Sequence, residues 1–204
     1  MKDTHKIKIL SSLDEFNKRG FRVEKCCIPL SIVYITCTAL TALTVVLASH
    51  FNLFKELPSI LTLVVASLVI VFLHELIHAI GFTLRRKIKW KGNIKIGHSL
   101  IRMSAYCKCS APVPFVDFLI AAVLPFVILG FGLFVFGVVV KSELLIFISI
   151  FNALSSIGDL MVFCKLLLIE RPSIILDMPN DMGFFALYDE KNTCSSPETS
   201  VESM

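Results

Sequence analysis

Four long apolar segments, separated by polar stretches, dominate the hydrophobic pattern of this chain. They cover about residues 28–48, 59–82, 115–140 and 144–169. Each is long enough for a helix that crosses a bilayer, which needs roughly 20 predominantly apolar residues. The mean hydropathy of +0.79 and the hydrophobic content of 55% exceed those of soluble domains. We therefore predict an all-α membrane protein whose four transmembrane helices make up a domain over residues 28–169.

The polar stretch between the second and third helices predicts a small sheet. Basic and apolar side chains alternate over residues 83–114, around candidate turns at Gly92 and Gly97. This pattern is typical of short strands joined by tight turns. We expect a cytosolic β-hairpin or small sheet inserted between helices two and three, with His98 as a turn residue.

The two ends of the chain are expected to lie outside the membrane. Residues 1–27 carry alternating charges and predict a cytosolic segment with a surface helix near residues 12–18. Residues 170–204 predict a cytosolic tail. Its apolar part, about 174–188, is expected to fold back on the cytosolic face, and the Ser/Thr/Glu-rich end from about 192 is expected to be disordered.

The positions of the basic residues predict the orientation of the helices. Residues 1–27 hold seven Lys and Arg and residues 83–114 hold eight, whereas Lys55 and Lys141 alone fall on the opposite side. The positive-inside rule then places both termini and the strand-rich loop in the cytosol. We expect a multi-pass protein of the cell membrane. Because the basic residues flank apolar helices, the net charge of +4 does not predict nucleic-acid binding.

The second apolar segment contains His74, Glu75 and His78, an H-E-x-x-H motif. Two histidines four residues apart lie on one face of a helix and can share a zinc ion, and the adjacent glutamate can take a proton from a water molecule. The alternative is that these are ordinary hydrogen-bonded core residues. However, an ionised carboxylate at mid-membrane costs about 3 kcal/mol, so an apolar core alone does not compensate Glu75.

The fourth apolar segment offers a candidate third ligand. Asp159 is its only acidic residue. If the second and fourth helices start on the outer side at residues 59 and 144, His74 and Asp159 both lie roughly 22 Å deep, within about 10 Å of the inner interface. Two His, one carboxylate and one water form a common catalytic zinc set. Asp159 pairing with Lys165, or capping a broken helix, is the alternative.

Together these motifs resemble two related families. An H-E-x-x-H helix with Asn152 and Asp159 on a later helix is similar to the site-2 protease pattern of intramembrane zinc peptidases. Over nearly its whole length the chain resembles the bacterial putative zincin peptidase family of small four-span proteins more closely. The stretches that carry this second resemblance are residues 74–78, 106–109 and 156–159, followed by Asp177, Pro179, Gly183 and Phe184.

The resemblance implies that His74, His78 and Asp159 bind one Zn²⁺ and that Glu75 is the catalytic acid and base. Asn152 is expected to bind the substrate backbone or the developing oxyanion. The chain departs from the site-2 protease pattern, because no Pro follows Asn152 and no Gly follows Asp159. These departures concern the handling of substrate more than the zinc site.

Two functions therefore remain open for the chain. The first is a zinc-dependent membrane endopeptidase that cleaves membrane or juxtamembrane proteins near the cytosolic leaflet. The second is an inactive zinc-binding scaffold or carrier. The expected partners are the lipid bilayer and a membrane protein or peptide substrate, and the sequence indicates no oligomeric state.

Overall fold

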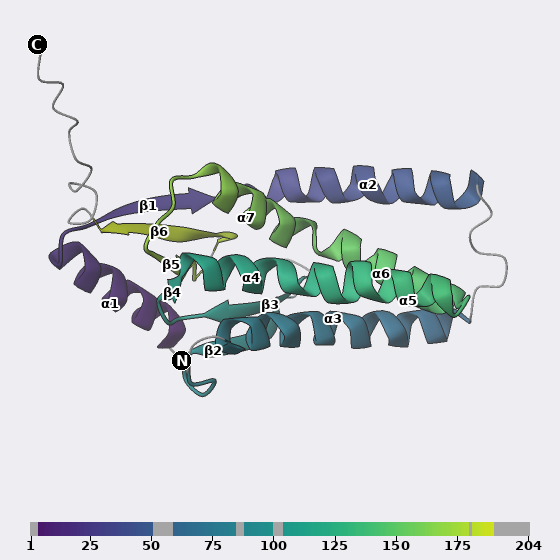
Figure 1. Cartoon of the computed structure of the whole chain (residues 1–204), viewed down its shortest axis with the longest axis horizontal. Helices are drawn as coiled ribbons and strands as arrows, with labels where there is room; N and C mark the ends of the chain where they lie inside the picture. Colours follow the sequence, from purple (N-terminus) through teal and green to yellow (C-terminus); the bar gives the residue numbers. More distant parts are fainter. Residues whose placement is uncertain (1–3, 51–58, 85–87, 100–103, 180, 190–204) are drawn as a thin grey trace, which may run out of the picture.

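The computed structural model describes residues 4–50, 59–84, 88–99, 104–179 and 181–189. Long helices run alongside one another, and the strands gather with the N-terminal helix at one end of them (Figure 1). The helical elements are α1 (Thr4–Lys18), α2 (Leu30–His50), α3 (Ile60–Leu84), α4 (Phe115–Pro125), the π-helical segment η1 (Phe126–Gly132), α5 (Leu133–Val139), α6 (Glu143–Ser155) and α7 (Ile157–Leu168). The strands are β1 (Phe21–Cys27), β2 (Ile94–Ser99), β3 (Ser104–Cys109), β4 (Val113–Pro114), β5 (Ile174–Asp177) and β6 (Gly183–Asp189).

The apolar segments form helices of membrane-spanning length. Within the described residues, α2, α3 and the continuous run from α4 to α5 are each long and apolar enough to cross a bilayer. The pair α6 and α7 makes a fourth span if its two parts are counted together. The structure thus agrees with three or four spans, and the domain boundaries and the orientation stay predictions.

Two of these helical runs are interrupted. Pro125 has no N–H to donate, and the helix continues after it with π-type hydrogen bonding through η1. The α6–α7 pair is bent by 50° at Ser156, whose N–H and hydroxyl both bond to the Asn152 carbonyl. A serine side chain that competes for helix carbonyls can bend a helix. The apolar segment predicted over residues 144–169 therefore forms two helices that meet at a bend, and together they can make one span.

The strands form two antiparallel sheets. The predicted insertion is present as a hairpin of β2 and β3. A second sheet, ordered β1-β6-β5-β4, joins the N-terminal segment to the chain that follows α7. The prediction of an all-α fold with one strand-rich insertion was incomplete, because the strands of this sheet pair over long sequence distances: Phe21 lies opposite Asp189.

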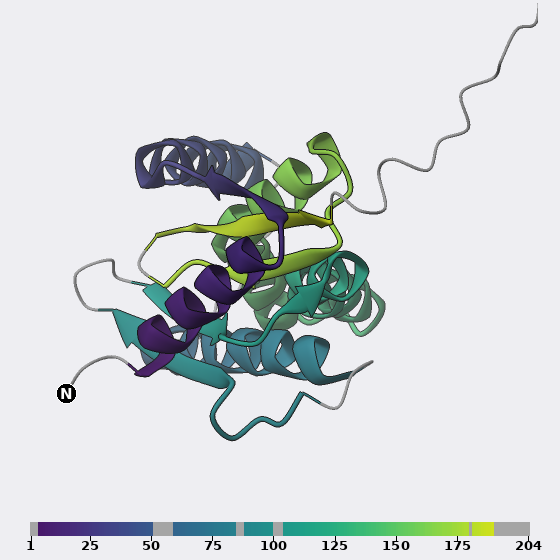
Figure 2. The same cartoon turned by 90° about the vertical axis from the view of Figure 1, so that its left-hand side faces the viewer.

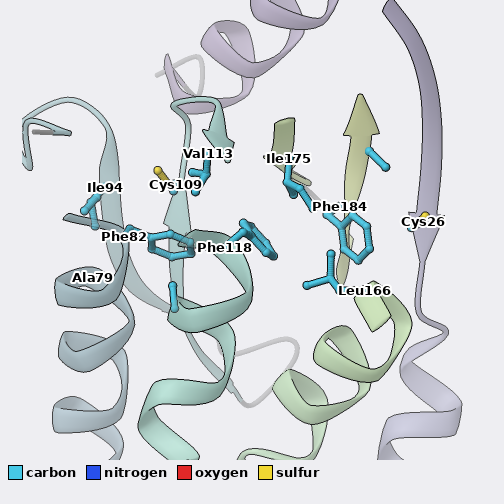
Figure 3. Packing of buried hydrophobic residues seen from close by; sticks show 12 residues of the cluster. Cys26, Ala79, Phe82, Ile94, Cys109, Val113, Phe118, Leu166, Ile175 and Phe184 are labelled. Atoms are coloured by element: carbon cyan, nitrogen blue, oxygen red, sulfur yellow. The ribbon is translucent and has the colours of Figure 1, made fainter. Parts of the chain in front are cut away.

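The four-stranded sheet is covered on both faces. In β6, Phe184 and Ala186 pack toward the ends of the long apolar helices, whereas Phe185 and Leu187 pack against α1. Figure 2 shows α1 lying across the sheet, with the helices seen end-on behind it. In Figure 3 the rings of Phe82 and Phe118 lie beneath the strands, with 5.6 Å between their centroids. This packing fixes the sheets over the ends of α3, α4 and α7.

The structure corrects the predicted position of His98. His98 lies in β2 opposite Ala105, so its placement in a turn is wrong; the turn that precedes β2 contains Gly92, at φ 86°. The tail from about residue 192, which we expect to be disordered, falls outside the described residues. So do several basic residues that support the predicted orientation, among them Lys55, Arg85, Arg86, Lys87 and Arg102.

Candidate metal centre

Helix α3 presents both histidines of the H-E-x-x-H motif to α7. Their Nε2 atoms lie 3.1 Å apart, as expected for residues four apart on one helix face. The bend at Ser156 places Asp159 in the first turn of α7, directly opposite. Its Oδ2 atom lies 3.0 Å from Nε2 of His74 and 3.3 Å from Nε2 of His78.

The three donor atoms have the spacing that a tetrahedral zinc ion requires. With zinc–nitrogen and zinc–oxygen bonds of about 2.05 Å, neighbouring ligands of a tetrahedral ion are separated by about 3.3 Å. The observed separations of 3.0, 3.1 and 3.3 Å are close to that value. A fourth coordination position would remain for a water molecule or a substrate.

The hydrogen bonds of the two Nδ1 atoms determine which nitrogen of each imidazole carries the proton. Nδ1 of His78 donates to the Ala121 carbonyl at 2.7 Å, and Nδ1 of His74 donates to Oδ1 of Asn152 at 3.0 Å. In the neutral form of both imidazoles the Nε2 atoms are then unprotonated, and their lone pairs converge with a carboxylate oxygen of Asp159. Three converging lone pairs repel one another unless a cation lies between them, so this donor set fits zinc.

Glu75 lies beside this cluster without contributing to it. Glu75 is 8% exposed, and it lines the same cavity as His74, His78 and Asp159. The cavity has a volume of about 850 Å³. A carboxylate at this position can exchange protons with a molecule in the cavity while the three donors hold a metal.

The cavity is lined by both helices and strands. Helices α2, α3, α4, α6 and α7 contribute most of its wall, and β3 with the turn between β5 and β6 forms the end nearest the sheets. Helix α2 packs against α6 and α7, and none of its residues is buried. One wall of the cavity is therefore a loosely packed helix.

Residues of the other motifs, in the stretch 106–109 and around Asp177, connect the β5–β6 turn to β3 by hydrogen bonds. The Lys108 ammonium donates to the carbonyls of Met178 and Pro179 at 2.8 and 2.7 Å. The Cys109 N–H donates to Oδ2 of Asp177. Burial raises the pKa of Asp177 to about 6, although the nearby Lys108 ammonium and the Cys109 N–H act in the opposite direction. These contacts hold the wall of the cavity together.

The structure brings together the three predicted metal ligands. Oδ2 of Asp159 contacts both histidines, and among the described residues it forms no ion pair with the exposed Lys165. Asn152 bonds to His74; its expected contact with substrate stays a prediction. Sequence reasoning missed Ala121, because only the fold shows that its carbonyl faces His78.

A family model described as putative zincin peptidase matches residues 67–175, slightly more than half of the chain. The match runs from the middle of α3 into β5 and includes all three donor residues. No curated protein matches the chain, and no solved structure matches it. The chain belongs to the putative zincin peptidase family.

Proposed function

We propose that the protein is a zinc-dependent membrane endopeptidase that hydrolyses peptide bonds of membrane or juxtamembrane proteins near the cytosolic leaflet. The observation that carries this proposal is the convergence of His74, His78 and Asp159 in a cavity that also contains the buried carboxylate of Glu75. Membership of the putative zincin peptidase family supports the same chemistry.

The residues around the cavity have separate roles in this proposal. His74, His78 and Asp159 would hold a zinc ion, which would supply a Lewis acid for the scissile carbonyl and lower the pKa of a water molecule. The Glu75 carboxylate removes a proton from the attacking water and then delivers it to the departing amine nitrogen. Glu75 therefore acts as base and then as acid, which requires that it not be a metal ligand.

Strand β3 offers a place for the substrate backbone. The Ser110 N–H bonds to Asn93 of the neighbouring chain segment, whereas the Cys109 N–H bonds outward to Asp177. Hydrogen bonding alternates along an antiparallel strand, so Ala105 and Cys107 also direct their backbone groups away from β2. Both residues line the cavity. An extended substrate can pair with this edge of β3. In the extended conformation its peptide bond is exposed, whereas a helix would shield it.

The position of the site supports cleavage near the sheet-bearing side of the membrane. His78 lies six residues before the end of α3 at Leu84, which corresponds to about 9 Å along the helix axis. The predicted orientation places that side in the cytosol. A substrate whose cleavage site lies at or just below the inner leaflet would reach the cavity without crossing the bilayer.

A cleavage assay with matched variants tests the proposal. Membrane proteins that accumulate in cells carrying Glu75→Gln would be co-reconstituted in liposomes with the wild-type protein, and new chain ends would be identified by mass spectrometry. We expect cleavage by the wild type and by Glu170→Gln, an exposed control, and no cleavage by Glu75→Gln or His74→Ala. Glu75→Gln should still bind zinc, whereas His74→Ala should not.

Two outcomes would contradict the proposal. Cleavage by Glu75→Gln at the wild-type rate would remove the proposed role of the carboxylate. A wild-type protein that binds zinc but cleaves none of the accumulated proteins would instead favour the inactive scaffold or carrier.

A further inference from the structure

The break in helix α4 at Pro125 lies directly behind the two histidines. We propose that Pro125 and Asn152 are positioning residues, which together hold both imidazoles in the tautomer that binds zinc. This inference rests on the proposed zinc site, but its test measures metal affinity and not peptide cleavage.

The first contact begins with the missing N–H of Pro125. In a regular helix the carbonyl of residue 121 would accept a hydrogen bond from the N–H of residue 125, and proline cannot donate it. Ala121 is fully buried, and a buried carbonyl without a donor is costly. His78 supplies the donor: its Nδ1 lies 2.7 Å from the Ala121 oxygen. The proline thus creates the acceptor that holds the proton of His78 on Nδ1.

The second contact passes through Asn152, which is 1% exposed. Its Nδ2 atom donates to the Pro125 carbonyl at 3.4 Å. A carbonyl oxygen can only accept, so this bond determines which end of the Asn152 amide faces Pro125. Oδ1 is left facing Nδ1 of His74 at 3.0 Å. His74 must therefore carry its proton on Nδ1 as well.

Both contacts have the same consequence at the metal site. A neutral imidazole carries one proton, and a nitrogen that carries it cannot bind a metal. The Nε2 atoms of His74 and His78 are only 3.1 Å apart, so a proton on either would occupy the space of the ion. Groups that fix the tautomer and the ring orientation of a ligand typically contribute 10–100-fold to metal affinity.

The test compares zinc affinity with the stability of the metal-free protein. Pro125→Ala restores the N–H of residue 125 and returns the Ala121 carbonyl to the helix. We expect this variant to unfold in excess chelator at the same temperature as the wild type or higher, because a proline inside a helix is unfavourable. We nevertheless expect its zinc dissociation constant to rise about tenfold or more. Pro29→Ala, an exposed proline before α2, is the matched control and should bind zinc as the wild type does.

Asn152 is tested by a pair of variants. Asn152→Leu removes the acceptor behind His74, and we expect zinc affinity to fall 10–100-fold. Asn152→Asp keeps an acceptor oxygen there and should recover most of that loss. If Asn152 served only to pack α6 against α3, Leu and Asp would affect stability without this difference in metal affinity.

The inference fails if Pro125→Ala and Asn152→Leu both remain folded and bind zinc as tightly as the wild type. The proposed peptidase function would still stand after that result, provided that the wild type cleaves its substrates. Conversely, weakened zinc binding by both variants, with no cleavage by the wild type, would support the positioning role and overturn the proposed function.

Discussion

Gly81 lies where α3 crosses α4, nearly one helical turn after His78. A Cβ atom at this position would lie 2.8 Å from Cα and 3.0 Å from Cβ of Ala121. Carbon atoms in contact are ordinarily separated by about 3.5–4.0 Å, so Gly81→Ala should push α3 and α4 apart by roughly 0.7 Å or more. Overpacking of this kind typically costs about 1–3 kcal/mol.

The same displacement should reach the metal site, because Ala121 also accepts the hydrogen bond from His78. That bond measures 2.7 Å. An added separation of roughly 0.7 Å stretches it beyond the normal limit of about 3.2 Å. We therefore expect Gly81→Ala to weaken zinc binding about tenfold, although residue 81 contacts no ligand atom.

The assay is competition with a zinc chelator in detergent, on protein that elutes as a single folded species. Gly130→Ala is the matched control, since a Cβ there would meet its neighbours at 3.4 Å or more, which is ordinary contact. A folded Gly81→Ala protein with wild-type zinc affinity would refute the link between helix spacing and the metal site.

Three further predictions concern the sheets and the wall of the cavity. Gly183 has φ 135°, and a Cβ there would overlap the Cys26 carbonyl, so Gly183→Ala should lower the unfolding temperature measured in detergent by several degrees. Because burial raises the folded-state pKa of Asp177 to about 6, stability should fall as pH rises from about 4 to 6, and Asp177→Asn should remove this dependence in the same unfolding assay. A stability that rises over this interval would contradict that assignment. Burial also raises the pKa of Cys109 to about 11, so mass spectrometry should find the exposed Cys27 alkylated at neutral pH well before Cys109 in the folded protein.

The local features of the site could be predicted from the sequence. Helical periodicity alone puts His74 and His78 on one face, and it makes Glu75 a neighbour that points elsewhere. The depth of Asp159 followed from counting residues along straight helices. The structure brings Asp159 and His74 together, as this count implies, even though α6 and α7 are bent by 50°. The depth of the pair in the membrane stays a prediction.

The features that depend on distant parts of the chain could not be predicted. The strand β1 pairs with β6 across more than 150 residues, and nothing in either segment alone specifies that partner. A proline such as Pro125 indicates a helix break, but the side chains that bond to the carbonyls of Ala121 and Pro125 come from α3 and α6. The sequence likewise could not show that the amide of Asn152 is already engaged by His74 and Pro125.

The central claim is that side chains of α3 and α7 hold one zinc ion. X-ray absorption at the zinc edge, on protein loaded with one equivalent of zinc, measures the ligands directly. We expect two imidazoles with the remaining ligands oxygen, at about 2.0–2.1 Å, and one imidazole fewer in His78→Ala. A sulfur ligand at about 2.3 Å, or a spectrum unchanged in His78→Ala, would contradict the site.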